Sequence, residues 1–209
     1  MNAVVLTSAY LGPVQYFTKL YAAPRVVEER ADHYVKQTYR NRCLIAGPDG
    51  PLALTLPVER SGPHTATRDV RLSDHGNWRH THWNALESAY ENSPYFPYYA
   101  DDFRRIYTQR YTFLVDFNEA LRELVCELLS LRPCLSISTD YVDAQAEGLD
   151  DYRETIRPKA DFRLDPHFSP APYYQVFSAR TGFLPNLSIA DLLFNMGPES
   201  RLVLRRSIV

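Results

Sequence analysis

The sequence predicts a fold of the α/β or α+β class, with a mixed sheet and several packed helices. Three observations lead to this class. Strand-like and helix-like segments alternate near the start, a hairpin signal follows at residues 39–58, and apolar residues change to helical spacing after Trp78. The 209 residues show no internal repeat, low-complexity segment or linker, so residues 1–209 are predicted to form one domain.

The first third of the chain is expected to supply most of the sheet. Residues 3–10 are typical of a buried strand, and residues 14–22 of a helix, since Pro13 suits a first helical turn. Residues 25–29 are predicted to form a second strand. Residues 39–47 and 52–58 predict a hairpin about the turn sequence Gly-Pro-Asp-Gly, and residues 66–73 a further sheet segment.

The middle of the chain is expected to be mainly helical. Trp78, His82 and Tyr90 fall on one helical arc, and the helix that carries them should end before Pro94. Residues 96–111 predict a second helix. Residues 117–131 predict a third, with a capping box formed by Asp116 and Glu119 at its start.

The last third mixes short elements. Residues 134–142 and 173–179 have strand-like composition, and residues 149–156 are predicted to form a short helix. Residues 187–197 predict a compact helix that begins after Ser188 as its N-cap and stops at Gly197.

Composition narrows the functional classes. A net charge of -2 argues against nucleic-acid binding, and no run reaches the roughly 18 apolar residues of a membrane span. The start lacks the features of a signal peptide, and three cysteines without a CxxC pair fit a reducing compartment, so a cytoplasmic location is expected. No motif for a metal or a cofactor is present, so neither is predicted; the sequence specifies no oligomeric state.

A cationic run at residues 36–45 is the first candidate for a binding site. If the run is extended, Lys36, Arg40 and Arg42 share one face, while Gln37 and Asn41 share the other. Arginine suits a carboxylate or a phosphate because its planar fork can donate two hydrogen bonds. These five residues are therefore candidate ligand-binding residues. The alternative is a solvated edge strand that carries cations to prevent aggregation.

Candidate catalytic residues are few. His82 lies on the apolar arc of its helix and is either a general acid or base or a satisfied core histidine. Cys43 would be a nucleophile if His82 lay beside it, but the alternation toward Ile45 favours a small buried apolar residue. Tyr90 is a candidate ligand-binding residue, since tyrosine offers an apolar ring and a polar tip. The adjacent carboxylates Asp150 and Asp151 are interpreted as solvated surface.

Four segments of the sequence together resemble WbqC-like proteins. They lie at residues 10–20, 36–58, 78–96 and 182–199, in this order along most of the chain. Gln37, Arg40, Asn41 and His82 match the polar signature of that family, whereas Cys43 is replaceable within it. The chain departs from the family pattern where Gly12 precedes Pro13, since two prolines or Pro-Trp are expected there.

The resemblance implies a role with surface polysaccharides of the O-antigen type, because the family takes its name from gene clusters for these polymers. The first hypothesis is an enzyme that modifies a nucleotide-linked amino sugar, by acyl or aminoacyl transfer. Its partner would be an anionic small molecule such as a sugar nucleotide or an acyl donor. The second is a non-catalytic module that binds a partner or carrier in the same pathway, through the tyrosine-rich residues 90–103.

Overall fold

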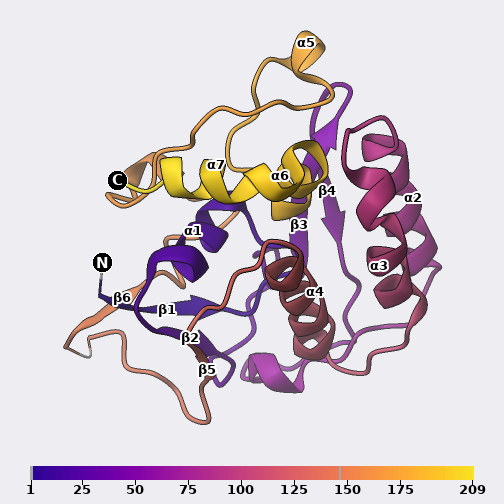
Figure 1. Cartoon of the computed structure of the whole chain (residues 1–209). Helices are drawn as coiled ribbons and strands as arrows, with labels where there is room; N and C mark the ends of the chain where they lie inside the picture. Colours follow the sequence, from indigo (N-terminus) through magenta and orange to yellow (C-terminus); the bar gives the residue numbers. More distant parts are fainter. Residues whose placement is uncertain (1, 146) are drawn as a thin grey trace.

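A computed structural model of the chain describes residues 2–145 and 147–209 and confirms an α/β fold. Its main sheet has four parallel strands in the order β5-β2-β1-β6 (Figure 1). Val4 of β1 pairs with Val26 of β2 on one side, and Val5 of β1 pairs with Asp151 of β6 on the other. The strands are β1 (Ala3–Thr7), β2 (Val26–Glu29), β5 (Leu135–Ile137) and β6 (Leu149–Asp151).

The segment that connects β1 to β2 folds as predicted. Helix α1 spans Val14–Ala22 directly after Pro13, whose φ of -68° is that of a fixed proline ring. The helix is buried along nearly its whole length, because α6 and α7 pack against it. A parallel pair needs such a crossover connection, and this one carries the chain from the end of β1 back to the start of β2.

The predicted hairpin is confirmed as a separate antiparallel pair. Strand β3 (Arg42–Gly47) and strand β4 (Gly50–Thr55) meet across Pro48 and Asp49, and Gly50 has a φ of +126° that favours glycine. The alternate residues Cys43 and Ile45 are fully buried. The hairpin stands beside the parallel sheet, and α2 and α3 lie on its far side in Figure 1.

Three helices in the middle of the chain are confirmed, with shifted ends. They are α2 (Trp78–Tyr90), α3 (Phe96–Thr108) and α4 (Leu114–Leu128). The predicted capping box at the start of α4 is wrong. The helix begins earlier, after Phe113, and no side chain caps it. Phe117 and Leu121 lie in the core, so the apolar stripe placed the helix correctly although its polar start did not.

Three predicted elements are wrong, each where a short segment meets a neighbour that the sequence does not reveal. Residues 66–73 hold the short helix η1 (Thr67–Asp69) and take part in three isolated bridges, His33 with Ala66, Val58 with Leu72 and Arg71 with Phe113. The predicted helix at 149–156 is strand β6, which β1 recruits as a parallel partner. Residues 173–179 form no strand and lead into α5 (Ser178–Thr181). Tertiary pairing overrides local preference in such short segments.

The helix predicted at residues 187–197 begins and ends as its caps predict. Helix α6 (Ile189–Met196) starts after Ser188, whose hydroxyl accepts a hydrogen bond from the backbone N–H of Ala190. Gly197 ends it with a φ of +52°. The short helices η3 (Gly197–Glu199) and α7 (Ser200–Arg206) follow, and η2 (Phe162–Leu164) lies further upstream.

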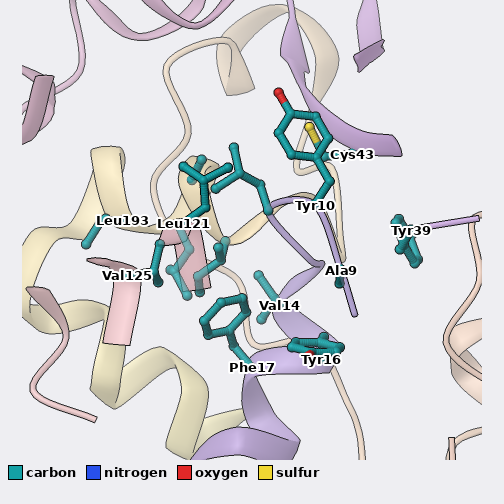
Figure 2. Close-up of a cluster of buried hydrophobic side chains, with 14 of the residues drawn as sticks. Ala9, Tyr10, Val14, Tyr16, Phe17, Tyr39, Cys43, Leu121, Val125 and Leu193 are labelled. Carbon is teal, nitrogen blue, oxygen red and sulfur yellow. The ribbon is translucent and has the colours of Figure 1, made fainter. Parts of the chain in front are cut away.

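The apolar core joins the sheet to the helices around it. Figure 2 shows Phe17 of α1, Leu121 and Val125 of α4 and Leu193 of α6 gathered in one cluster.

Within the described residues, every helix is too short or too polar to cross a bilayer.

Candidate functional site

The carboxyl ends of the four parallel strands meet at one edge of the sheet. The chain runs from β1 to β2 on one side of the sheet and returns later to place β6 on the other side of β1. A reversal of this kind leaves a crevice at the carboxyl edge, where open α/β sheets bind their ligands. Charged residues follow the strand ends here: Arg30 and Asp32 after β2, and Arg153 after β6.

A cavity of about 310 Å³ opens at this edge, and we call it the sheet-edge pocket. Two pairs of an arginine and a carboxylate form its polar walls, Arg40 with Asp32 and Arg153 with Asp151. The two pairs come from two separate chain segments, residues 32–40 and residues 151–153, which only the folded sheet brings together. The lining residues are Asp32, His33, Val35, Arg40, Tyr141, Ala144, Asp151, Arg153 and Glu154.

Arg40 is held in this wall by both its backbone and its side chain. Its carbonyl oxygen accepts a hydrogen bond from the Asn118 amide at 2.8 Å, and that amide also donates to the Ser8 hydroxyl at 3.0 Å. Its guanidinium contacts Asp32 through Nη2 and lies 3.4 Å from the Thr38 hydroxyl through Nη1. These contacts fix the side chain, which is only 2% exposed.

One donor of Arg40 is left without a partner. Its Nε–H finds no hydrogen-bond acceptor among the described residues, and the nearby hydroxyl of Tyr34 also finds no partner there. Burial raises the pKa of Tyr34 to about 12, while the charge of Arg40 acts in the opposite direction. Buried donors in native proteins are nearly always paired with protein, water or ligand. The Nε–H of Arg40 is therefore an unsatisfied donor in a side chain that lines this pocket.

Arg153 is held by carboxylates on two strands. Its Nε and Nη2 donate to both oxygens of Asp151, at 2.9 and 2.7 Å, and its Nη1 lies 3.3 Å from Glu29. Its guanidinium also stacks 4.8 Å from the centre of the Tyr141 ring. Burial raises the pKa of Asp151, but the hydrogen bonds from Arg153 outweigh it and hold this pKa below its usual value.

Glu29 supports the pocket from behind. It is fully buried at the end of β2 and accepts hydrogen bonds from the Ser138 hydroxyl and the backbone N–H of Val142, both at 2.7 Å. Its carboxylate therefore ties the segment after β5 to Arg153 on the far side of β1. A charge buried this deeply is stable only when it is paired and hydrogen-bonded, as it is here.

The structure separates most of the cationic residues that the sequence grouped together. The expectation of an extended run from residue 36 is wrong, because residues 36–41 form turns and β3 begins only at Arg42. Lys36 and Gln37 are exposed, and Gln37 has a φ of +60°. Only Arg40 of the five candidates lines the sheet-edge pocket.

Asn41 and Arg42 serve the hairpin instead. The Asn41 amide is buried and donates to the carbonyl oxygen of Leu56 at 3.1 Å, next to the end of β4. The Arg42 guanidinium donates to the hydroxyl of Thr55, its partner across the two strands. Both contacts fasten the hairpin, and neither side chain lines the sheet-edge pocket.

His82 lies in the aromatic core between α2, α4 and the turn after β1. It is 5% exposed, its Nδ1 is 2.9 Å from the Tyr10 hydroxyl, and that hydroxyl is 2.6 Å from the hydroxyl of Tyr107. The ring also packs edge-on against Trp78. Burial lowers the pKa of His82 to about 4, partly offset by a hydrogen bond with the backbone of Thr55. This environment favours the core-histidine alternative over a general acid or base.

Tyr90 is likewise part of the interior. Its hydroxyl donates to the buried carboxylate of Asp191 at 2.9 Å and accepts a hydrogen bond from the backbone N–H of Ala46 at 3.0 Å. The side chain is fully buried and packs against Phe194. Tyr90 thus joins α2 to both β3 and α6, which is a structural role.

Cys43 is sealed inside the hairpin, and Figure 2 shows its sulfur beside the ring of Tyr10. Burial raises the pKa of its thiol, and a hydrogen bond with Tyr10 acts in the opposite direction. Cys126 is also buried, and burial raises its pKa to about 11, whereas Cys134 is exposed. Thiols react as thiolates, so the two buried cysteines should be inert.

We expect one of the three thiols, that of Cys134, to react promptly with a disulfide reagent in the native protein. The other two should react only after unfolding, because burial keeps them protonated and inaccessible. Spectrophotometric titration with Ellman's reagent, with and without denaturant, measures both fractions. Prompt reaction in a Cys134→Ser variant that is lost in Cys43→Ala would instead identify Cys43 as reactive.

Several residues of the sheet-edge pocket were missed from the sequence. Asp151 was interpreted as solvated surface, but it is a strand residue that binds Arg153, so that interpretation is wrong. Asp32, Glu29 and Tyr141 were not singled out. The sequence does contain one indication of this pocket, because charged residues follow directly after the predicted strand at 25–29. The same signal after β6 was hidden by the prediction of a helix there.

A larger cavity of about 660 Å³ lies between Tyr39 and residues 158–163, and several of its polar side chains are already bonded within the chain. Arg163 bonds to Asp161 twice, and the Asn186 amide is bonded to Gln15. The smaller sheet-edge pocket, with its unpartnered donor at Arg40, is therefore the better candidate for a ligand site.

Comparisons with other proteins place the chain in a family. The uncharacterized protein Rv1507c of Mycobacterium tuberculosis is 30% identical over 189 residues, which cover 80% of this chain and 81% of the relative. No solved structure matches the chain significantly. The sequence pattern of WbqC-like proteins matches residues 8–158, a range that includes every residue lining the sheet-edge pocket. The chain belongs to the WbqC-like protein family.

Proposed function

We propose that the sheet-edge pocket binds a nucleotide-linked amino sugar, and that the protein acts in the biosynthesis of surface polysaccharides of the O-antigen type. The single observation that carries this proposal is the unpartnered Nε–H of Arg40 in a pocket that also contains Arg153. Two guanidinium groups, each fixed by a carboxylate, form a rigid frame for a phosphate or carboxylate.

The balance of charge in the pocket supports a ligand that carries both signs. The two arginines suit a phosphate group, while Asp32, Asp151 and the exposed Glu154 suit an amino group or hydroxyls. A phosphorylated amino sugar presents both kinds of group within one molecule. A simple dianion would instead be repelled by the three carboxylates, so phosphate alone should bind more weakly.

The family resemblance supports the pathway, and the reaction stays a prediction. Acyl or aminoacyl transfer to the amino group of the sugar is the reaction class expected from the sequence. Its expected base, His82, lies in the aromatic core, so the exposed carboxylate of Glu154 is the group of this pocket best placed to accept a proton from an amine.

Replacement of Arg40 by lysine tests the proposal directly. Lysine keeps the positive charge opposite Asp32 but removes the Nε–H. We expect the affinity for a bound sugar nucleotide to fall on the order of tenfold or more, because a hydrogen bond to a charged group is worth about 1.5–3 kcal/mol. Isothermal titration calorimetry with a panel of uridine- and thymidine-diphosphate amino sugars measures the affinity.

Arg205→Lys is the matched control, since Arg205 is exposed on α7 and lines none of the cavities described above. It should bind as the unmodified protein does, and the thermal midpoints of both variants show whether they fold. Glu154→Gln should weaken binding of the amino-sugar nucleotides by a few fold, because it removes a carboxylate that would face the charged amino group. The proposal fails if no member of the panel binds, or if Arg40→Lys binds as well as Arg205→Lys.

A carrier-binding module is the second candidate, and one observation favours it. Tyr98 on α3 is 76% exposed and lies beside Tyr95, whose ring is 6.3 Å away. Exposed tyrosines are common anchors in protein interfaces. Much of the remaining tyrosine-rich segment is buried, with Phe96 and Phe103 in the core. A Tyr98→Ala variant that keeps sugar-nucleotide binding but fails to capture a carrier protein would support this second role.

A further inference from the structure

Helices α2 and α3 enclose a second cavity, of about 310 Å³, which we call the α2–α3 cavity. It shares no lining residue with the sheet-edge pocket. Four of its lining residues come from the start of α2 and the residue before it, and three from the last turns of α3. These residues are Asn77, Arg79, His80, Trp83, Arg104, Tyr107 and Thr108.

Trp83 provides the first sign of a ligand. The side chain is only 7% exposed and packs against the rings of Phe96 and Tyr107. Its indole N–H has no acceptor among the residues that the structure describes. Trp78, one turn earlier on the same helix, donates its indole N–H to the carbonyl oxygen of Ser73 at 2.9 Å. A buried indole N–H usually has such a partner, so the one on Trp83 is an unsatisfied donor in a side chain that lines this cavity.

The charge around the cavity provides the second sign. Arg104 is exposed and forms no ion pair within the described part of the chain, and Arg79 has an Nε–H that finds no acceptor there. The carboxylate that pairs with Arg79 is Asp74, which lies outside the lining. The lining therefore contains two guanidinium groups and no carboxylate. Such a concave surface attracts an anion.

The walls of the cavity set the character of the rest of the ligand. Trp83 and Tyr107 contribute aromatic rings, and the hydroxyl of Tyr107 is already bonded to Tyr10. Tyr107 therefore offers the ligand its ring alone. These two rings pack on each other, with centroids 6.2 Å apart, so an apolar or aromatic body would lie against their outer edges while its charged end meets the arginines at the rim.

We propose that the α2–α3 cavity is a binding site for a small organic acid with an apolar body, such as an aromatic carboxylate. The carboxylate accepts the hydrogen bond of the Trp83 indole N–H and lies against the guanidinium groups of Arg79 and Arg104. This site is independent of the sugar-nucleotide proposal, since the two cavities have no residue in common.

The two tryptophans of the chain make the test internally controlled, because each gives one indole signal in a ¹H–¹⁵N correlation spectrum. We expect titration with benzoate to shift the Trp83 signal downfield in a saturable way, as its N–H gains an acceptor. The Trp78 signal, whose N–H is already bonded, should move far less. Trp83→Phe removes one signal and so assigns both.

Three variants and one analogue complete the test. By ligand-observed NMR, Trp83→Phe should weaken benzoate binding on the order of tenfold, since it keeps an aromatic ring but loses the donor. Arg104→Gln should weaken it roughly fivefold, and the exposed Arg205→Gln should not change it. Benzyl alcohol, which lacks the charge, should bind more weakly than benzoate.

The proposal is overturned if neither indole signal moves up to the solubility limit of benzoate, or if both move equally. It is also overturned if Arg104→Gln and Arg205→Gln bind alike. Inorganic phosphate that shifts the Trp83 signal as strongly as benzoate would show that the apolar body is not recognised. None of these results depends on whether sugar nucleotides bind at the sheet edge.

Discussion

Replacement of Lys19 by methionine should lower the free energy of unfolding by about 3–5 kcal/mol, which is a large part of the stability of an ordinary domain. Lys19 and Asp165 form an ion pair at 2.7 Å in which both side chains are fully buried. The ammonium group also lies 4.5 Å from the centre of the Tyr152 ring. Methionine fills a similar volume but leaves the Asp165 carboxylate without its cation.

The remaining contacts of Asp165 explain why the loss should be large but not unlimited. Its carboxylate also accepts hydrogen bonds from the Gln15 amide at 2.8 Å and from the backbone N–H of His167 at 3.0 Å. Those neutral donors stay in place in the variant. They occupy hydrogen-bond acceptor sites of the Asp165 carboxylate, but they do not neutralise its charge, which is buried away from water.

Urea denaturation followed by circular dichroism measures this effect. The double variant Lys19→Met with Asp165→Leu should recover most of the lost stability, because it removes both buried charges together. Arg105→Gln is the matched control, since Arg105 pairs with Asp102 at 3.7 Å on the exposed surface of α3. It should change stability by less than about 1 kcal/mol. A loss below that value for Lys19→Met would contradict the expectation.

Local sequence predicts the hairpin and α6 but not the burial of Lys19 on α1. The turn Gly-Pro-Asp-Gly, the N-cap Ser188 and the stop Gly197 act within a few residues of themselves, so the hairpin and α6 were correctly predicted. The burial of Lys19 could not be predicted, because α1 packs against helices that come far later in the chain.

The sheet-edge pocket depends on the order of the strands, which no local pattern reveals. Arginine in a cationic run is suggestive by itself, so the sequence indicates Arg40. Its partner Asp32 lies only eight residues earlier, but Arg153 faces it only after β6 has joined β1. A wrong helix at residues 149–156 was enough to hide that half of the pocket. Strand order, rather than residue type, was the missing information.

His82 should make the protein less stable as the solution is acidified from about pH 6.5 to pH 4. Burial lowers its pKa in the folded state from 6.5 to about 4, while the unfolded chain keeps the ordinary value. Between these values the unfolded state binds a proton that the folded state does not, so the free energy of unfolding falls with pH. Each unit of pKa corresponds to about 1.4 kcal/mol, so the full effect is roughly 3 kcal/mol.

The groups around the imidazole support the expected direction, a loss of stability on acidification. Tyr10 bonds to the imidazole, and Tyr107 and Cys43 contact Tyr10 in turn. Burial raises the pKa of all three, so they stay neutral across this pH range. None of them supplies the negative charge that would stabilise a protonated imidazole. The ring therefore stays neutral in the folded protein and serves the hydrogen bond with Tyr10.

Subtraction isolates the contribution of His82 from that of the many carboxylates that also titrate in acid. Urea denaturation at pH 7, 6, 5 and 4 gives the free energy of unfolding of the unmodified protein and of His82→Gln, which keeps a polar group near Tyr10. The difference between the two should shrink by roughly 3 kcal/mol on acidification, because only the unmodified protein has this histidine to protonate.

His75→Gln, an exposed control, should leave the pH dependence unchanged. A difference that stays constant with pH would mean that the imidazole is already accessible to protons in the folded protein, and the general acid or base role of His82 would then regain support.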